Sequence, residues 1–234
     1  MTDIHTHVLH GIDDGSSDLE NSLKMLDVMS KQGVHTVVCT PHFDYRVIDP
    51  ENFLKNRDEK ISELREAVKK RGLDIEILSG CELKLNNRML TLESAREFCI
   101  GNTKNILIEL PVSSIWEETD INRLINFCDY YNVRPVIAHV ERYASVNKSL
   151  KYADKLIDLG AILQLDGASL YEKLYQKTAK KLLKKGYISV VASDAHNLTT
   201  RPSSVLNDAY DTIKKMCGVD AVETLKHNAE LLLK

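Results

Sequence analysis

Residues 134–143 read Arg-Pro-Val-Ile-Ala-His-Val-Glu-Arg-Tyr, an apolar run that ends in a histidine followed by charged side chains. Short apolar, β-branched runs of this kind predict strands covered on both faces, as in a parallel sheet. Because parallel strands need crossover connections, their alternation with helical segments predicts an α/β fold. Seven strands are predicted, over residues 2–5, 34–40, 75–79, 105–110, 134–139, 161–165 and 188–192.

The intervening segments have helical period. Ser17 and Glu20 are spaced as a capping box, which predicts the start of the first helix. Residues 80–104 have the weakest pattern and leave room for a short helix only. The predicted helices span 18–32, 51–71, 120–131, 148–159 and 172–185, and two more follow the last strand.

The composition of the chain indicates the number of domains and argues against some classes of partner. The 234 residues contain no linker, which predicts a single domain over residues 1–234. A net charge of -3 argues against a nucleic-acid partner, and the lack of a long apolar run argues against membrane insertion. Five scattered cysteines, the polar N-terminus and the absence of CxxC spacing predict a reduced, cytoplasmic protein. Nothing in the sequence indicates the oligomeric state.

Six of the seven predicted strands end in residue types that bind metal ions. Residues i and i+2 of a strand project to the same side, so His5 with His7, and Asp194 with His196, can each hold one cation. An open sheet would spread such groups along a line, whereas a closed barrel gathers them around one mouth. We therefore expect a seven-stranded β/α barrel. The candidates are His5, His7, Asp13, Asp14, His42, Glu82, Glu109, His139, Asp194 and His196. The sixth strand, ending near Asp166, carries no comparable signal.

A thiol phosphatase is a weaker alternative. Cys128 and Arg134 have the C-x5-R spacing of phosphate-cradling loops. Such a loop needs small residues before a helix N-terminus, whereas this segment holds two tyrosines and leads into a strand. Cys128 is therefore interpreted as a helix residue.

Four segments carry a resemblance to a known family, namely Asp3-Ile4-His5-x-His7, Thr40-Pro41-His42, Ala138-His139-x-Glu141-Arg142-Tyr143 and Ala192-Ser193-Asp194-Ala195-His196-Asn197. With them the chain resembles the polymerase-and-histidinol-phosphatase (PHP) superfamily, and within it the manganese-dependent tyrosine-protein phosphatases of the CpsB/CapC capsular polysaccharide type. The resemblance implies the distorted (β/α)7 TIM-like barrel of that superfamily. Histidine 10 is a departure, since close relatives often carry proline there.

The family pattern implies three divalent metal ions, with Mn²⁺ preferred over Fe²⁺ or Zn²⁺. His5, His7, Glu82 and Asp194 would hold the first. Glu82 would bridge to a second, completed by Glu109 and His139, and the third would take Asp14, His42 and His196. The sequence leaves open whether Asp13 or Asp14 is the ligand. Arg142 and Arg201 match the substrate-binding arginines of the family.

The implied reaction is hydrolysis of phosphotyrosine, on the tyrosine kinase that controls capsule or exopolysaccharide synthesis. Three divalent ions and four ligand carboxylates leave two positive charges, which suit a phosphate monoester dianion. Four aromatic residues, Phe43, Tyr45, Trp116 and Tyr143, follow strand ends and either flank a phenyl ring or pack in the core. A phosphatase of small phosphate monoesters and a non-catalytic, metal-loaded regulator of the kinase remain alternatives.

Overall fold

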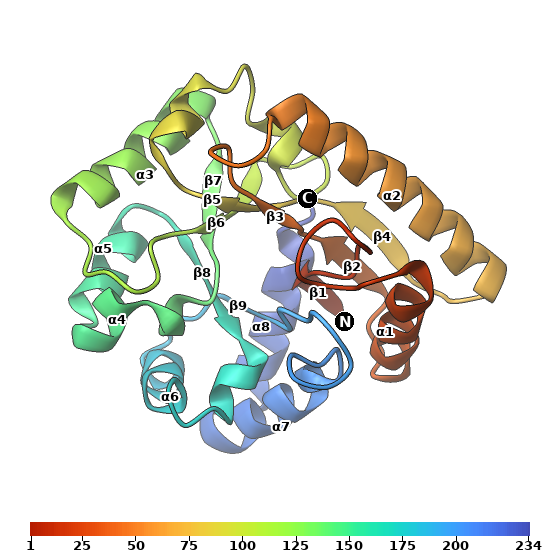
Figure 1. Ribbon diagram of the computed structural model, residues 1–234. Coiled ribbons are helices and arrows are strands. Elements are labelled where there is room, and N and C mark those ends of the chain that lie inside the picture. Colours follow the sequence, from red (N-terminus) through yellow and green to blue (C-terminus); the bar gives the residue numbers. More distant parts are fainter.

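All pairings between neighbouring strands are parallel, and the strands curl into the expected distorted barrel (Figure 1). The computed structural model describes residues 1–234. Its sheets have the orders β1-β2-β4 and β3-β5-β6-β7-β8-β9. The strands are β1 (Thr2–Thr6), β2 (Thr36–Cys39), β3 (His42–Phe43), β4 (Glu76–Ser79), β5 (Glu82–Lys84), β6 (Asn105–Glu109), β7 (Arg134–Ile137), β8 (Ile162–Asp166) and β9 (Val190–Ala192).

The second and third predicted strands correspond to β2 and β4, and each is followed after a two-residue break by a further short strand, β3 or β5, that was not predicted. Cys39 pairs with Ser79 before the break, and His42 pairs with Glu82 after it. Both pairs differ by 40 positions, so the register is kept across the interruption. One contributor is Pro41, which has no N–H to donate to a ladder. The break makes His42 and Glu82 the first residues of β3 and β5.

The two sheets meet between β1 and the segment after β9. Thr6 and Ala195 form an isolated parallel bridge, and the N–H of His7 donates to the carbonyl of Ala195 at 2.9 Å. Strand β9 ends at Ala192, so Asp194 and His196 lie beyond it. The predicted end of this strand at residue 192 is confirmed, but strand alternation does not by itself put Asp194 and His196 on one side. The bridge at Ala195 holds the segment beside β1.

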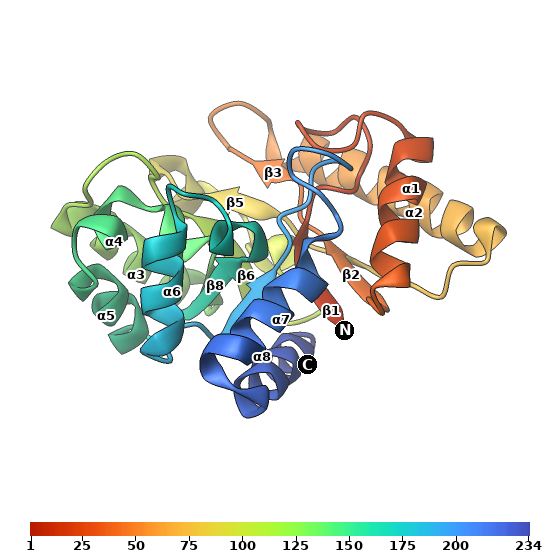
Figure 2. The ribbon, with the colours of Figure 1, turned by 90° about the horizontal axis from the view of Figure 1, so that it is seen from below.

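Helices surround the sheet, and Figure 2 places α7 and α8 on the side away from β3. The predicted helix over 148–159 corresponds to α5, which starts at Lys151, and the one over 172–185 starts later, at Gln176. The short helix α4 was not predicted. Residues 80–104 hold β5 and two short 3-10 helices, η1 (Asn87–Thr91) and η2 (Arg96–Phe98). The helices are α1 (Leu19–Lys31), α2 (Pro50–Arg71), α3 (Glu118–Tyr131), α4 (Ala144–Lys148), α5 (Lys151–Asp158), α6 (Gln176–Lys184), α7 (Val205–Cys217) and α8 (Val219–Leu231). None of them is long and apolar enough to cross a membrane.

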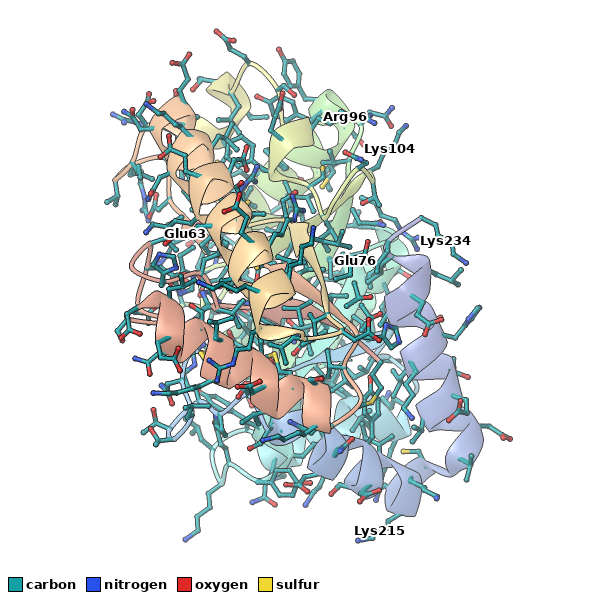
Figure 3. All side chains as sticks on the ribbon, turned by 90° about the vertical axis from the view of Figure 1, so that its right-hand side faces the viewer. Glu63, Glu76, Arg96, Lys104, Lys215 and Lys234 are labelled. Atoms are coloured by element: carbon teal, nitrogen blue, oxygen red, sulfur yellow. The ribbon has the colours of Figure 1, made fainter.

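The predicted capping box of α1 is wrong. The N-cap is Asp18, whose carboxylate accepts the N–H of Asn21 at 2.8 Å. Ser17 instead donates to the Asp18 carboxylate, and Glu20 pairs with Arg71 of the adjacent helix α2. Asp is as good an N-cap as Ser, so adjacent candidates compete for the position. Helices α1 and α2 lie side by side on the outside of the barrel (Figure 3).

Two apolar clusters stabilise the barrel. The larger lies between the strands and the surrounding helices, and the smaller consists mainly of inward-facing strand residues such as Ile4, Leu107 and Val136. Ala229 and Leu232, at the end of the chain, belong to the smaller cluster. The C-terminal segment therefore closes the amino end of the barrel, which leaves the polar side chains at the opposite, carboxyl end.

Candidate metal centre

A β-bulge in β1 sets the direction of the two N-terminal histidines. Asp3 pairs with Val37 and Thr6 pairs with Cys39, so three steps along β1 match two along β2. In a regular strand, the inward position of Ile4 would turn His5 outward. The extra residue lets Ile4 and His5 both face the barrel interior, and His7 follows on the same side as His5. His5 and His7 are fully buried at the mouth.

All nine ligand candidates that the family pattern implied come together in three groups. Within each group the possible ligand atoms lie within 4.8 Å of one another. His7 belongs to two groups, which was not expected, and Glu82 belongs to two, which was. The first group is His5, His7, Glu82 and Asp194, the second is Glu82, Glu109 and His139, and the third is His7, Asp14, His42 and His196.

The first group has the donor set that a cation requires. Nε2 of His5 and Nε2 of His7 face each other at 3.2 Å. Oδ1 of Asp194 lies 3.3 Å and 3.4 Å from these nitrogens and is buried without a hydrogen bond. Buried polar atoms that converge without partners are costly unless something compensates them. Imidazole and carboxylate without thiolate suit Mn²⁺, Fe²⁺ or Zn²⁺.

The structure separates the roles of Asp13 and Asp14. Oδ2 of Asp13 lies 2.6 Å from Nδ1 of His7 and accepts the N–H of His42 at 3.0 Å, and Oδ1 accepts the N–H of Gly15. Burial would raise the pKa of Asp13, but the hydrogen bond and charge of His7 and the backbone N–H groups of Gly15 and His42 together outweigh it and lower that pKa to about 2. Asp14 has a side chain that is 66% exposed, with Oδ1 3.3 Å from Nε2 of His42. The geometry favours Asp14 as the ligand and Asp13 as the residue that orients His7.

Charges within the three groups stabilise one another. Burial would raise the pKa of Glu82, but His5, His139 and His42 hold it well below its usual range. Burial would lower the pKa of His7, yet Asp13 and Asp194 raise it well above its usual value. Neighbouring carboxylates also raise the pKa values of His42 and His139, so a cation entering the groups has to displace protons from His7, His42 and His139.

Arg142 and Arg201 converge on one carboxylate of the first group. Nη1 of Arg142 donates to Oδ2 of Asp194 at 2.8 Å, and Nη2 of Arg201 donates to the same oxygen at 2.5 Å. Arg142 also pairs with Asp166 at the end of β8. Asp194 and Asp166 are both buried, so these contacts are not ion pairs of the surface.

Two polar residues of β8 were missed. Asp166 holds Arg142, and Gln164 contacts His5 and His139. Both lie in a strand that is otherwise apolar. They follow Ile162 by two and four residues, which places them with it on the inward face of the strand. The sequence signal for these two residues was a polar side chain at strand positions that alternation predicts to face inward. His10 lies outside the three groups, because its Nε2 pairs at 3.2 Å with Glu63 of α2, labelled in Figure 3.

Three of the four aromatic candidates are core residues. Phe43, Trp116 and Tyr143 are buried in the larger apolar cluster, and the hydroxyl of Tyr143 accepts the N–H of Leu110. Only Tyr45 is partly exposed. Ordinary packing therefore accounts for three of these positions.

The segment with C-x5-R spacing, from Cys128 to Arg134, lacks the structure of a phosphate-binding loop. Cys128 lies in α3, as predicted, and Arg134 is the first residue of β7, at the end of the barrel opposite the mouth. Burial raises the pKa of Cys128 to about 12, so the thiol stays protonated at neutral pH. This pair does not form a phosphate-binding loop.

A parallel β/α barrel with histidines, carboxylates and arginines gathered at the carboxyl ends of its strands defines a metallohydrolase of the barrel class. Residues 1–234 match the family described as capsular polysaccharide synthesis, CpsB/CapC, and the chain belongs to that family. The tyrosine-protein phosphatase CpsB of Streptococcus agalactiae is 30% identical over 246 residues, covering 100% of this chain and 98% of the relative. The tyrosine-protein phosphatase YwqE of Bacillus subtilis is 29% identical over 242 residues, covering 100% and 92%.

Solved structures support the same placement. A structure from a study of YwqE from Bacillus subtilis and CpsB from Streptococcus pneumoniae, described as metal-dependent tyrosine phosphatases, has a TM-score of 0.88 at 29% identity and covers 100% of this chain and 94% of the other. A phosphotriesterase homology protein from Escherichia coli has a TM-score of 0.60 at 12% identity, covering 100% and 98%, which shows a shared fold only.

Proposed function

We propose that the chain is a metal-dependent tyrosine-protein phosphatase. The observation that carries the proposal is the convergence of three groups of ligand-type residues and two arginines at one barrel mouth. The names of the relatives that match over the full chain support the same activity.

The three groups would hold three divalent ions, with Mn²⁺ preferred and Fe²⁺ or Zn²⁺ as alternatives. Glu82 is shared between the first and second groups, and His7 lies close to both the first and third. Divalent ions held there would supply Lewis-acid charge and a water nucleophile at neutral pH. Asp13 orients His7 by accepting from Nδ1, which turns Nε2 toward the other ligands.

The arginines bind the phosphoryl group. Their guanidinium groups meet at Oδ2 of Asp194, whose other oxygen faces His5 and His7. Arg142 and Arg201 therefore lie next to the ligand groups. There each can give up its hydrogen bond to the carboxylate oxygen and donate to a phosphoryl oxygen instead. Tyrosine has a pKa of about 10, so a phenolate leaves with little help from a general acid.

The substrate is a phosphotyrosyl protein, and its identity follows from the family. The description of the family as one of capsular polysaccharide synthesis supports the tyrosine kinase of that process as the partner. A kinase domain in the cytoplasm would meet the phosphatase there, and the five free cysteines fit a reducing compartment.

The test begins with protein stripped by EDTA and reloaded separately with Mn²⁺, Fe²⁺ and Zn²⁺. Hydrolysis of a phosphotyrosyl peptide and of histidinol phosphate is then compared. We expect metal-dependent turnover with preference for the peptide. Preference for histidinol phosphate would support a small-molecule phosphatase, and binding of the kinase without turnover at any metal would support a regulator.

A further inference from the structure

The strand without a predicted ligand, β8, carries a fully buried glutamine beneath the mouth of the barrel. Oε1 of Gln164 accepts the backbone N–H of His139 at 2.8 Å and lies 3.1 Å from Nδ1 of His5. We propose that Gln164 is a positioning residue that selects the metal-binding tautomer of His5 and holds His139 in place. This inference rests on the proposed metal centre.

The hydrogen bonds fix the amide orientation. A backbone N–H can only donate, so the atom of Gln164 that faces His139 has to be the oxygen. The same oxygen faces Nδ1 of His5, so that nitrogen carries the proton. A neutral imidazole has one N–H, which leaves the lone pair of His5 on Nε2.

This tautomer matters because of what surrounds Nε2. That nitrogen lies 3.3 Å from Asp194 Oδ1 and 3.4 Å from Glu82 Oε2. The two carboxylates attract the imidazole proton to Nε2, where it would occupy the position of a cation. Gln164 opposes them by accepting at Nδ1. Asp13 accepts in the same way at Nδ1 of His7, so once His7 has lost its Nε2 proton both imidazoles turn an Nε2 lone pair toward the first group.

The second contact of Gln164 supports an unfavourable backbone conformation. His139 has φ +34°, in the left-handed region that residues with a Cβ rarely adopt. Its N–H is tied to Gln164, and its Nε2 lies 2.8 Å from Oε1 of Glu82. One amide oxygen therefore positions one histidine of the first group and one of the second, and Glu82 belongs to both groups.

The experiment measures Mn²⁺ affinity on metal-free protein, by calorimetry and by the electron paramagnetic resonance of free Mn²⁺. Gln164→Met keeps the size of the side chain and removes the acceptor. We expect the tightest Mn²⁺ binding to weaken by about 10–100-fold. Gln164→Glu retains an acceptor oxygen and recovers most of the loss. Leu163→Met, on the same strand but facing the helices, is the matched control and binds Mn²⁺ like the wild type.

Unchanged Mn²⁺ affinity in a folded Gln164→Met variant overturns the inference while leaving the metal centre intact. A wild-type protein that binds no Mn²⁺, Fe²⁺ or Zn²⁺ overturns the proposed function itself. The tautomer gives a test that needs neither metal nor variant. Nitrogen-15 spectra of metal-free wild-type protein, at a pH where His5 is neutral, should show the proton on Nδ1, and a proton on Nε2 contradicts the role of Gln164.

Discussion

Oδ2 of Asp194 accepts a hydrogen bond from Nη1 of Arg142 at 2.8 Å, while Oδ1 of the same carboxylate points to the histidines of the first group. One buried side chain therefore links the candidate ligand cluster to the candidate substrate-binding arginine. Guanidinium has no acceptor and cannot bind a cation, so Asp194 is the candidate metal ligand and Arg142 the candidate phosphate-binding residue.

Replacement of Arg142 separates substrate binding from metal binding. We expect Arg142→Ala to keep its metal content and fold but to lose about 10²–10³-fold in kcat, because a preorganised contact to developing phosphoryl charge is gone. Arg142→Lys should recover only part, since an ammonium lacks the planar fork of donors. Steady-state kinetics at measured metal occupancy check this. Near-normal turnover of the alanine variant at full occupancy would exclude Arg142 from catalysis.

The shared carboxylate predicts unequal metal losses. Glu82 lies in two groups, so Glu82→Ala should lose two ions, whereas His42→Ala, from the third group alone, should lose about one. Elemental analysis of both purified variants measures the stoichiometry, with circular dichroism to verify folding. Equal losses would contradict a bridging role for Glu82.

Activity should depend on metal and on no thiol. Chelation should abolish turnover, and reloading should restore it. Cys128→Ser should retain nearly wild-type kinetics, because burial keeps that thiol protonated and Arg134 lies at the end of the barrel opposite the candidate ligands. The assay compares wild type and variant before and after EDTA. An inactive serine variant with its metals still bound would overturn this assignment.

Sequence patterns were sufficient for the barrel and for the residue types at its mouth. Apolar β-branched runs identify strands, and a histidine or carboxylate directly after such a run is visible without structural knowledge. The local sequence did not predict the bulge that turns both Ile4 and His5 inward, because no glycine or proline marks it. The common break in β2/β3 and β4/β5 was also missed, although Pro41 and Gly80 lie in it, because the pairing resumes between two strands 40 residues apart.

Residues that support the candidate ligands were harder to find than the ligands. Gln164 and His5 are 159 positions apart, and their contact exists only once the barrel closes. Asp18 and Ser17 illustrate the same limit locally, because both are good N-caps and only the backbone geometry selects between them. Residue type reveals possible chemistry, whereas orientation depends on contacts between distant segments.

The metal-free site holds protons that a cation has to displace, which predicts a pH dependence of metal binding. Burial would lower the pKa values of His7, His42 and His139, but neighbouring carboxylates raise all three above the usual 6.5. Glu82 and Asp194 have lowered pKa values and stay ionised. Near neutral pH, binding should therefore release protons from histidines and none from these carboxylates.

The direction of the pH dependence of metal binding follows from the raised pKa values. Below them the imidazoles are protonated and compete with the cation, so apparent Mn²⁺ affinity should increase as the pH rises through the folded pKa values, above 6.5. The same protons stabilise the metal-free fold below the unfolded pKa, and this contribution is lost over the same rise. Calorimetric titrations in buffers of different ionisation enthalpy count the released protons, and thermal unfolding of metal-free protein tests stability. Mn²⁺ binding near pH 7 without proton release would show that these histidines are already neutral.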